Sequence, residues 1–151
     1  MNELSQIPNF LLLPNGIATS GQPSPAQFSA IKNAGYQLVV NLAVPSSTNF
    51  LPEEAGIAQK NGLEYVHIPV DWEHPQIEEA QQFFRLLEEN HDNRVLVHCA
   101  LNMRVSTFLY LYRTLVQNSD EESARADLER IWTPNAIWQN FIEDVRAQYT
   151  Q

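Results

Sequence analysis

Cysteine is the residue that the sequence most nearly lacks, because its 151 residues contain a single one, Cys99. One thiol cannot form an intramolecular disulfide, so a disulfide-stabilised secreted domain is excluded and a reducing compartment is favoured. The segment 1–16 lacks a basic region, and its apolar run at Phe10–Leu13 is too short for a signal peptide. We therefore expect a cytoplasmic protein.

Basic residues are also scarce. Nine Lys and Arg residues stand against eighteen Asp and Glu residues, which gives a formal net charge of −9. Such a chain has no general field to attract nucleic acids or anionic membranes, so neither is expected as a partner. No segment approaches the roughly eighteen apolar residues that a membrane span needs. A phosphate group would have to be bound by a local arrangement.

The remaining composition is that of a globular protein, with 44% hydrophobic and 18% charged residues. The length favours one domain, which we place at 7–149, and neither repeats nor linkers interrupt it. Pro14-Asn15-Gly16 lies between two short apolar runs, which predicts a small N-terminal hairpin. The later segments alternate, with strands expected at 36–42, 64–69 and 94–98 and helices at 25–33, 52–61, 75–90, 103–117, 120–131 and 134–149.

This alternation predicts an α/β fold, with a mainly parallel sheet flanked by helices on both faces. In such sheets the functional site lies beyond the carboxyl ends of the strands. Cys99 directly follows the apolar run that ends at His98. The pattern therefore places the single thiol at the expected site.

The loop after Cys99 has the composition of an anion site. Backbone amides that converge on the start of the next helix bind anions and stabilise a thiolate. Arg104 adds a planar cation that can hold two oxygens of a phosphate, and Ser106 and Thr107 add hydroxyls. A lone cysteine at a strand end is more often inert core, but this combination favours a reactive thiolate.

Three segments together resemble the cysteine-dependent protein tyrosine and dual-specificity phosphatases. VLVHCALNMRVST resembles their signature of a buried strand, His-Cys, a loop, and then Arg with Ser or Thr. YVHIPVDWEHPQIEEAQQFFRLLEE resembles the segment that carries their mobile acid loop. IATSGQPSPAQFSAIKNAGYQLVVNL resembles a bacterial phosphatase-like group also called beta-lactamase-hydrolase-like.

The resemblance implies a protein tyrosine phosphatase-like fold and a phosphoric monoester hydrolase that needs no metal or cofactor. Cys99 would attack phosphorus and form a thiophosphoryl intermediate, and Asp71, or Glu73 in reserve, would protonate the leaving oxygen. His98 would support the loop as a buried, hydrogen-bonded histidine, and Ser106 would help the sulfur to leave. The substrate would be a phosphoprotein or a small phosphate monoester. The phosphate would be held by Ala100, Leu101, Asn102, Met103, Arg104, Val105 and Ser106.

The spacing departs from that signature, in which the arginine lies six positions beyond the cysteine, whereas Arg104 lies five beyond Cys99. Without a gap, Val105 takes the arginine position, and Asn102 takes the place of a loop glycine, where left-handed backbone is required. With a loop one residue shorter, Arg104 is the counterpart. The short spacing is also that of rhodanese-like sulfurtransferases. Two alternatives to a phosphatase therefore stay open, a sulfurtransferase and a non-catalytic phosphate-binding protein.

Other polar and aromatic residues have simpler interpretations. His67 and His74 do not form a metal-ligand pattern with cysteine or carboxylates. Asn41 is expected either to orient the loop or to serve structure, and Trp72 either to form a wall beside the substrate or to cover the sheet edge. The oligomeric state stays open. Four acidic pairs are expected to be solvated helix faces, namely Glu53-Glu54, Glu78-Glu79, Glu88-Glu89 and Glu121-Glu122.

Overall fold

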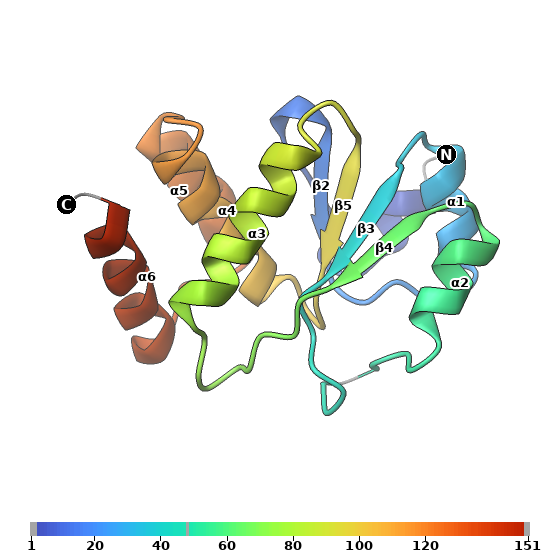
Figure 1. Ribbon diagram of the computed structural model, residues 1–151, viewed down its shortest axis with the longest axis horizontal. Helices are drawn as coiled ribbons and strands as arrows, with labels where there is room; N and C mark the ends of the chain where they lie inside the picture. Colours follow the sequence, from blue (N-terminus) through green and yellow to red (C-terminus); the bar gives the residue numbers. More distant parts are fainter. Residues whose placement is uncertain (1–2, 48, 150–151) are drawn as a thin grey trace.

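A five-stranded sheet forms the centre of the molecule. The computed structural model describes residues 3–47 and 49–149. The strands lie in the order β1-β2-β5-β3-β4, and all neighbours are parallel except β1 and β2 (Figure 1). This arrangement confirms the predicted mainly parallel sheet. The strands are β1 (Leu11–Leu12), β2 (Ile17–Ser20), β3 (Leu38–Asn41), β4 (Glu64–His67) and β5 (Val95–His98).

The predicted N-terminal hairpin is formed by β1 and β2. Its turn contains Asn15 at φ 66° and Gly16 at φ 79°, both in the left-handed region. Asn and Gly are the residues that adopt this backbone at least cost. The hairpin places β2 beside β5, with Ser20 opposite His98.

Every expected helix is present, and each differs from its predicted bounds by at most two residues at either end. Prolines precede several of these helices, and glycines at positive φ follow α1 and α2, as the sequence indicates. The helices are α1 (Gln27–Asn33), α2 (Glu54–Lys60), α3 (Ile77–Glu89), α4 (Met103–Leu115), α5 (Glu121–Glu129) and α6 (Ala136–Tyr149), and a 3-10 helix, η1 (Glu3–Gln6), precedes them.

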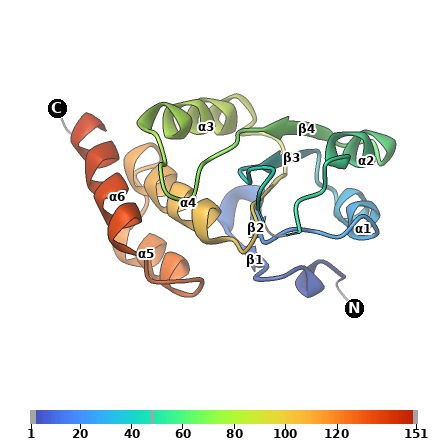
Figure 2. The same ribbon diagram turned by 90° about the horizontal axis from the view of Figure 1, so that it is seen from below.

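The helices form two layers around the sheet. Helices α1 and α2 cover one face, and α3 to α6 cover the other (Figure 2). One apolar core packs η1, α1 and α2 against the sheet, and a larger one packs α3 to α6 against the opposite face. The protein is therefore a single α/β domain with both sheet faces covered, as predicted.

The four parallel strands end at the same edge of the sheet. In Figure 1 their arrowheads point downward, so the loops that follow β2, β3, β4 and β5 gather below the sheet. Strand β5 lies between β2 and β3, and His98 is opposite both Ser20 and Asn41. Cys99 therefore starts a central loop with neighbouring loops on both sides. Within the described residues, no helix is both long and apolar enough to cross a bilayer.

Candidate active site

A cavity of about 270 Å³ opens at this edge of the sheet. Cys99 belongs to its lining, although the residue as a whole is only 1% exposed. The loop after β3, the loop after β4 and the start of α4 supply the other walls. The lining residues are Val44, Ser46, Ser47, Trp72, Cys99, Ala100, Leu101, Met103 and Arg104.

The loop turns into α4 at Asn102, which has the left-handed φ of 67° that its place in the signature requires. Its side-chain Nδ2 donates to the carbonyl of Asn9 at 2.8 Å and to the hydroxyl of Thr19 at 3.0 Å. This turn starts a helix of 13 residues, and the first amides of a helix have no intrahelical acceptor. The amides of the residues that open α4 are thus available to an anion in the cavity.

Arg104 is the cation of the site. Its Nη1 donates to the carbonyl of Val70 at 3.0 Å, and its Nη2 donates to the hydroxyl of Ser47 at 3.2 Å. The ring of Trp72 lies 5.7 Å from the guanidinium carbon. The guanidinium is thereby fixed in place, yet within the described part of the chain its buried Nε has no hydrogen-bond partner.

The structure separates the two alignments that the spacing left open. Arg104 lines the cavity, whereas Val105 is fully buried in the core. These positions favour the alignment in which Arg104 is the counterpart of the signature arginine and the loop is one residue shorter. Val105, which we expected among the phosphate-binding residues, contributes no side chain to the lining.

Ser106 and Thr107 do not bring their hydroxyls to the cavity. Both donate to the carbonyl of Met103, at 3.1 and 3.0 Å. Ser106 lines a different, small cavity together with Thr19 and Leu109. The position gives no support to the expected role of Ser106 in releasing the sulfur.

Asp71 is not brought into the cavity, although its neighbour Trp72 is. The Asp71 side chain is 61% exposed, and its Oδ1 accepts from the amide of Glu73 at 2.8 Å. That hydrogen bond, with a smaller contribution from His74, holds the pKa of Asp71 below its usual value. Glu73 is exposed as well and does not line the cavity.

An aromatic cluster holds the loop after β4 in place at Trp72. Trp138 of α6 donates from its Nε1 to the carbonyl of Trp72 at 2.9 Å. The ring of Trp72 lies 5.2 Å from that of Trp132 and 5.7 Å from that of Trp138. Trp72 therefore forms a wall of the cavity, the first of the two roles expected for it.

Asn41 stabilises the start of the loop that follows β3. Its Oδ1 accepts from the amide of Ala43 at 2.8 Å, and its Nδ2 donates to the hydroxyl of Tyr65 at 3.0 Å. His67 also contacts the Ala43 carbonyl, at 2.5 Å. These contacts fix the start of the segment that carries Val44 and Ser47 to the cavity.

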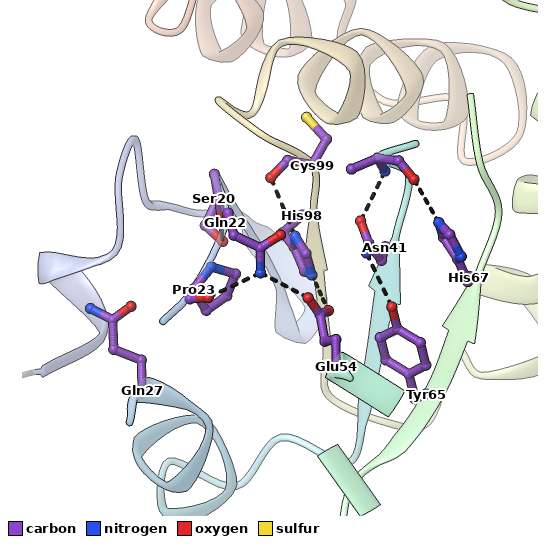
Figure 3. A network of polar contacts seen from close by, with 12 residues as sticks. Ser20, Gln22, Pro23, Gln27, Asn41, Glu54, Tyr65, His67, His98 and Cys99 are labelled. Carbon is purple, nitrogen blue, oxygen red and sulfur yellow. Dashed lines mark hydrogen bonds and ion pairs between the residues drawn. The ribbon is translucent and has the colours of Figure 1, made fainter. Parts of the chain in front are cut away.

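Behind the cysteine lies a buried network that the sequence did not predict. His98 is fully buried, as expected, and pairs with Glu54 of α2 (Figure 3). Glu54 is 1% exposed, so the expectation that the Glu53-Glu54 pair is solvated is wrong for Glu54 and holds for Glu53. The sequence held one indication that Glu54 is buried. Glu54 lies four residues before Ala58, so both residues share one face of α2, and that face is buried.

Among the described residues, no group of three or more His, Cys, Asp and Glu side chains is placed to hold a metal ion. The groups that the cavity itself offers are the thiol of Cys99 and the guanidinium of Arg104. An oxyanion that enters would meet Arg104 and the start of α4 while it contacts Cys99.

A buried thiol at the end of a central parallel strand and a fixed arginine at the start of the next helix line one cavity, as expected of a phosphatase-like protein. The comparisons with known proteins agree. Residues 15–142 match the family described as DSP-PTPase phosphatase fused to NAD+ kinase. The chain belongs to this family, and its predicted relationship to the protein tyrosine and dual-specificity phosphatases is confirmed.

Solved structures show the same fold. The DUF442 candidate phosphatase from Shewanella putrefaciens CN-32 is 33% identical, with 98% of this chain and 97% of that chain covered and a TM-score of 0.86. The core catalytic domain of the PP-IP phosphatase SIW14 from S. cerevisiae is 19% identical over 91% and 85% of the two chains, with a TM-score of 0.72.

TpbA from P. aeruginosa is 15% identical to this chain, covers 97% and 93% of the two chains and has a TM-score of 0.72. At such low identity, this similarity and that to SIW14 concern the fold alone. No curated protein matches the chain.

Proposed function

We propose that the protein is a cysteine-dependent phosphatase that hydrolyses a phosphate monoester. One observation carries the proposal: within the described residues, the guanidinium of Arg104, whose buried Nε has no partner, lines the same cavity as the only thiol. A buried polar group without a partner is costly, and a bound phosphate oxygen would satisfy it. The family to which the chain belongs supports the same chemistry.

In the proposed first step the Cys99 thiolate attacks phosphorus. A sulfur–phosphorus bond forms, the ester oxygen–phosphorus bond breaks, and the leaving oxygen takes a proton from an acid. Arg104 and the amides that open α4 stabilise the charge on the phosphoryl oxygens. In the second step water attacks phosphorus, the sulfur leaves as thiolate, and the acid recovers its proton from that water.

Asp71 stays our candidate for the acid, with Glu73 in reserve. In the structure Asp71 is exposed and does not line the cavity. Delivery of its proton therefore requires the loop between β4 and α3 to turn inward around Trp72. Such loop movements are common steps of enzyme turnover.

The test uses p-nitrophenyl phosphate and three variants. Cys99→Ser is expected to abolish turnover, and Arg104→Lys to lower kcat/KM by about 10²- to 10³-fold, because lysine cannot reproduce the fixed planar fork. Arg130→Lys, at an exposed position, is the matched control. Equal rates for the wild-type protein and Cys99→Ser would overturn the proposal. A mass increase of one phosphoryl group on Cys99 after acid quench would identify the intermediate.

A phosphate-binding protein without turnover is the second candidate. The observation that favours it is the exposed position and lowered pKa of Asp71, which leave the cavity without a protonated acid in the present arrangement. This candidate predicts that inorganic phosphate protects Cys99 from alkylation while no ester is hydrolysed. Turnover of p-nitrophenyl phosphate that depends on Cys99 would rule it out.

A further inference from the structure

Glu54 is a buried carboxylate that has no role in the proposed reaction. It lies on α2, and both of its oxygens are paired (Figure 3). Oε1 accepts from the side-chain Nε2 of Gln22 at 2.7 Å, and Oε2 pairs with the Nε2 of His98. A buried carboxylate is tolerated only with such partners. Gln22 follows β2, and His98 ends β5 directly before residues 99–102, which we call the cysteine loop.

Each partner of Glu54 also holds one backbone carbonyl of that loop. The Nδ1 of His98 lies 3.3 Å from the carbonyl oxygen of Cys99. The backbone amide of Gln22 donates to the carbonyl oxygen of Ala100 at 3.1 Å. In Figure 3 the Cys99 carbonyl oxygen points toward His98, and the sulfur points the opposite way. The two carbonyls are thus held by groups that converge on Glu54.

The close approach of the segment after β2 to the Ala100 carbonyl depends on Gly21. A Cβ atom at this position would lie 2.6 Å from the Ala100 carbonyl oxygen, nearer than such atoms come in real structures. An isolated bridge pairs Gly21 with Leu101 in antiparallel fashion. The Ser-Gly-Gln-Pro run of the sequence therefore lies against the back of the cysteine loop.

The hydrogen-bond partners also constrain where the protons of the network lie. A carbonyl only accepts, so the Nδ1 of His98 carries a hydrogen. Its Nε2 then shares one proton with Glu54, as imidazolium with carboxylate or as imidazole with carboxylic acid, and either form is neutral in total. Tyr65 is a further titratable group that interacts with Glu54. Burial, opposed by a hydrogen bond from Asn41 and aided by Glu54, raises the pKa of Tyr65 to about 12, so that the hydroxyl is neutral at physiological pH.

We propose that Glu54 is a positioning residue, which acts through His98 and Gln22 to turn the carbonyls of Cys99 and Ala100 away from the cavity. An anion-binding loop must direct its amides inward, and a carbonyl that turned inward would repel the anion. Because the network is neutral in total, Glu54 acts by geometry and adds no field at the thiol. This inference goes beyond the proposed function, since it concerns oxyanion binding and not turnover.

The experiment measures alkylation of Cys99 by iodoacetamide and its suppression by inorganic phosphate. Cys99 is the only cysteine, so the signal reports on this site alone. Glu54→Leu and Gln22→Met remove the shared hydrogen bonds and are expected to weaken phosphate protection by about tenfold or more. Glu53→Gln, at the exposed neighbour, is the matched control and is expected to behave as the wild-type protein.

Glu54→Gln separates geometry from charge. Its amide oxygen can accept from Gln22 while its NH₂ donates to the Nε2 of neutral His98, so every hydrogen bond is kept. We expect phosphate protection within about threefold of wild type and an unchanged pH dependence of alkylation. A tenfold loss in Glu54→Gln, or a shifted pH dependence, would overturn the proposal.

The effects of Gln22 and Glu54 are expected to be coupled. A Gln22→Met, Glu54→Leu double variant is expected to lose no more phosphate protection than the worse single variant. If Glu54→Leu does not fold, wild-type protection in Gln22→Met would overturn the proposal by itself. Phosphate that does not protect wild-type Cys99 would overturn it too. A protein that binds phosphate but hydrolyses no ester would remove the proposed function and leave this test intact.

Discussion

For Arg104, the sequence predicted an anion site but did not determine the alignment with the phosphatase signature. Its type and its nearness to Cys99 indicated an anion site. Its alignment stayed open, because one residue of displacement on a helix turns a side chain by about 100°. The left-handed turn at Asn102 sets where α4 starts, and Arg104 then lines the cavity. The same rotation explains why Ser106, two residues further along the helix, misses the cavity.

Asp71 is tested best through the leaving group of the substrate. A phenyl or alkyl leaving group needs a proton more than p-nitrophenol does. Asp71→Asn is therefore expected to slow hydrolysis of phenyl phosphate by about 10²-fold or more, and that of p-nitrophenyl phosphate far less. Glu73→Gln is the matched comparison. If Glu73→Gln shows this selective loss and Asp71→Asn does not, the acid is Glu73.

The backbone of Asn102 leads to a prediction about the loop itself. Glycine adopts a φ of 67° freely, whereas alanine pays about 1 kcal/mol or more for it and also leaves the Asn9 carbonyl and the Thr19 hydroxyl without their donor. Urea unfolding is therefore expected to show a larger loss of stability for Asn102→Ala than for Asn102→Gly. Equal losses would mean that the side-chain hydrogen bonds, and not the backbone, dominate.

At the scale of elements, local sequence signals were enough to predict where most helices and strands lie. Proline before a helix, glycine after it and apolar runs of strand length were enough to place α1 to α6 and the sheet strands closely. Contacts between elements were not accessible in this way. Glu54 is an example, because an acidic pair in the first turn of a helix is typical of a solvated face, and only the packing of α2 beside His98 makes it internal.

Gly21 lies where the end of β2 meets the cysteine loop, and its substitution tests this contact. The added methyl group in Gly21→Ala would meet the Ala100 carbonyl at 2.6 Å, so either β2 or the cysteine loop must shift. Overpacking of this kind costs about 1–3 kcal/mol. We expect a lower urea midpoint together with weaker phosphate binding. Gly56→Ala, where an added Cβ meets nothing within 4 Å, is the control and is expected to retain both.

At the scale of the whole molecule, charge makes the site unusual for a protein that binds phosphate. Among the cations of the described residues, Arg104 alone lines the cavity, and the chain carries a net charge of −9. A doubly negative ester is therefore repelled at long range and attracted only at contact. We expect kcat/KM for p-nitrophenyl phosphate to rise or stay level as ionic strength increases from about 0.02 to 0.2 M. A steep fall would contradict this picture.

Alkaline pH tests the burial of Tyr65. In the unfolded chain its hydroxyl ionises near pH 10, and in the fold the pKa is about 12. Between these values the unfolded chain alone releases the proton, so the stability that is present below pH 10 is lost as pH rises toward 12. Tyr65→Phe is expected to lose less stability over this range, measured by urea midpoints. An identical pH dependence for both proteins would mean that the Tyr65 hydroxyl is solvated.

The three tryptophans of the chain give the molecule a built-in optical probe. Trp72, Trp132 and Trp138 lie within 5.2 to 6.3 Å of one another, and Trp72 lines the cavity beside Arg104. Because the chain has no tryptophan elsewhere, its tryptophan emission comes entirely from this corner of the fold. Occupancy of the cavity, or an inward turn of the segment that carries Trp72, can thus be followed by fluorescence without any label.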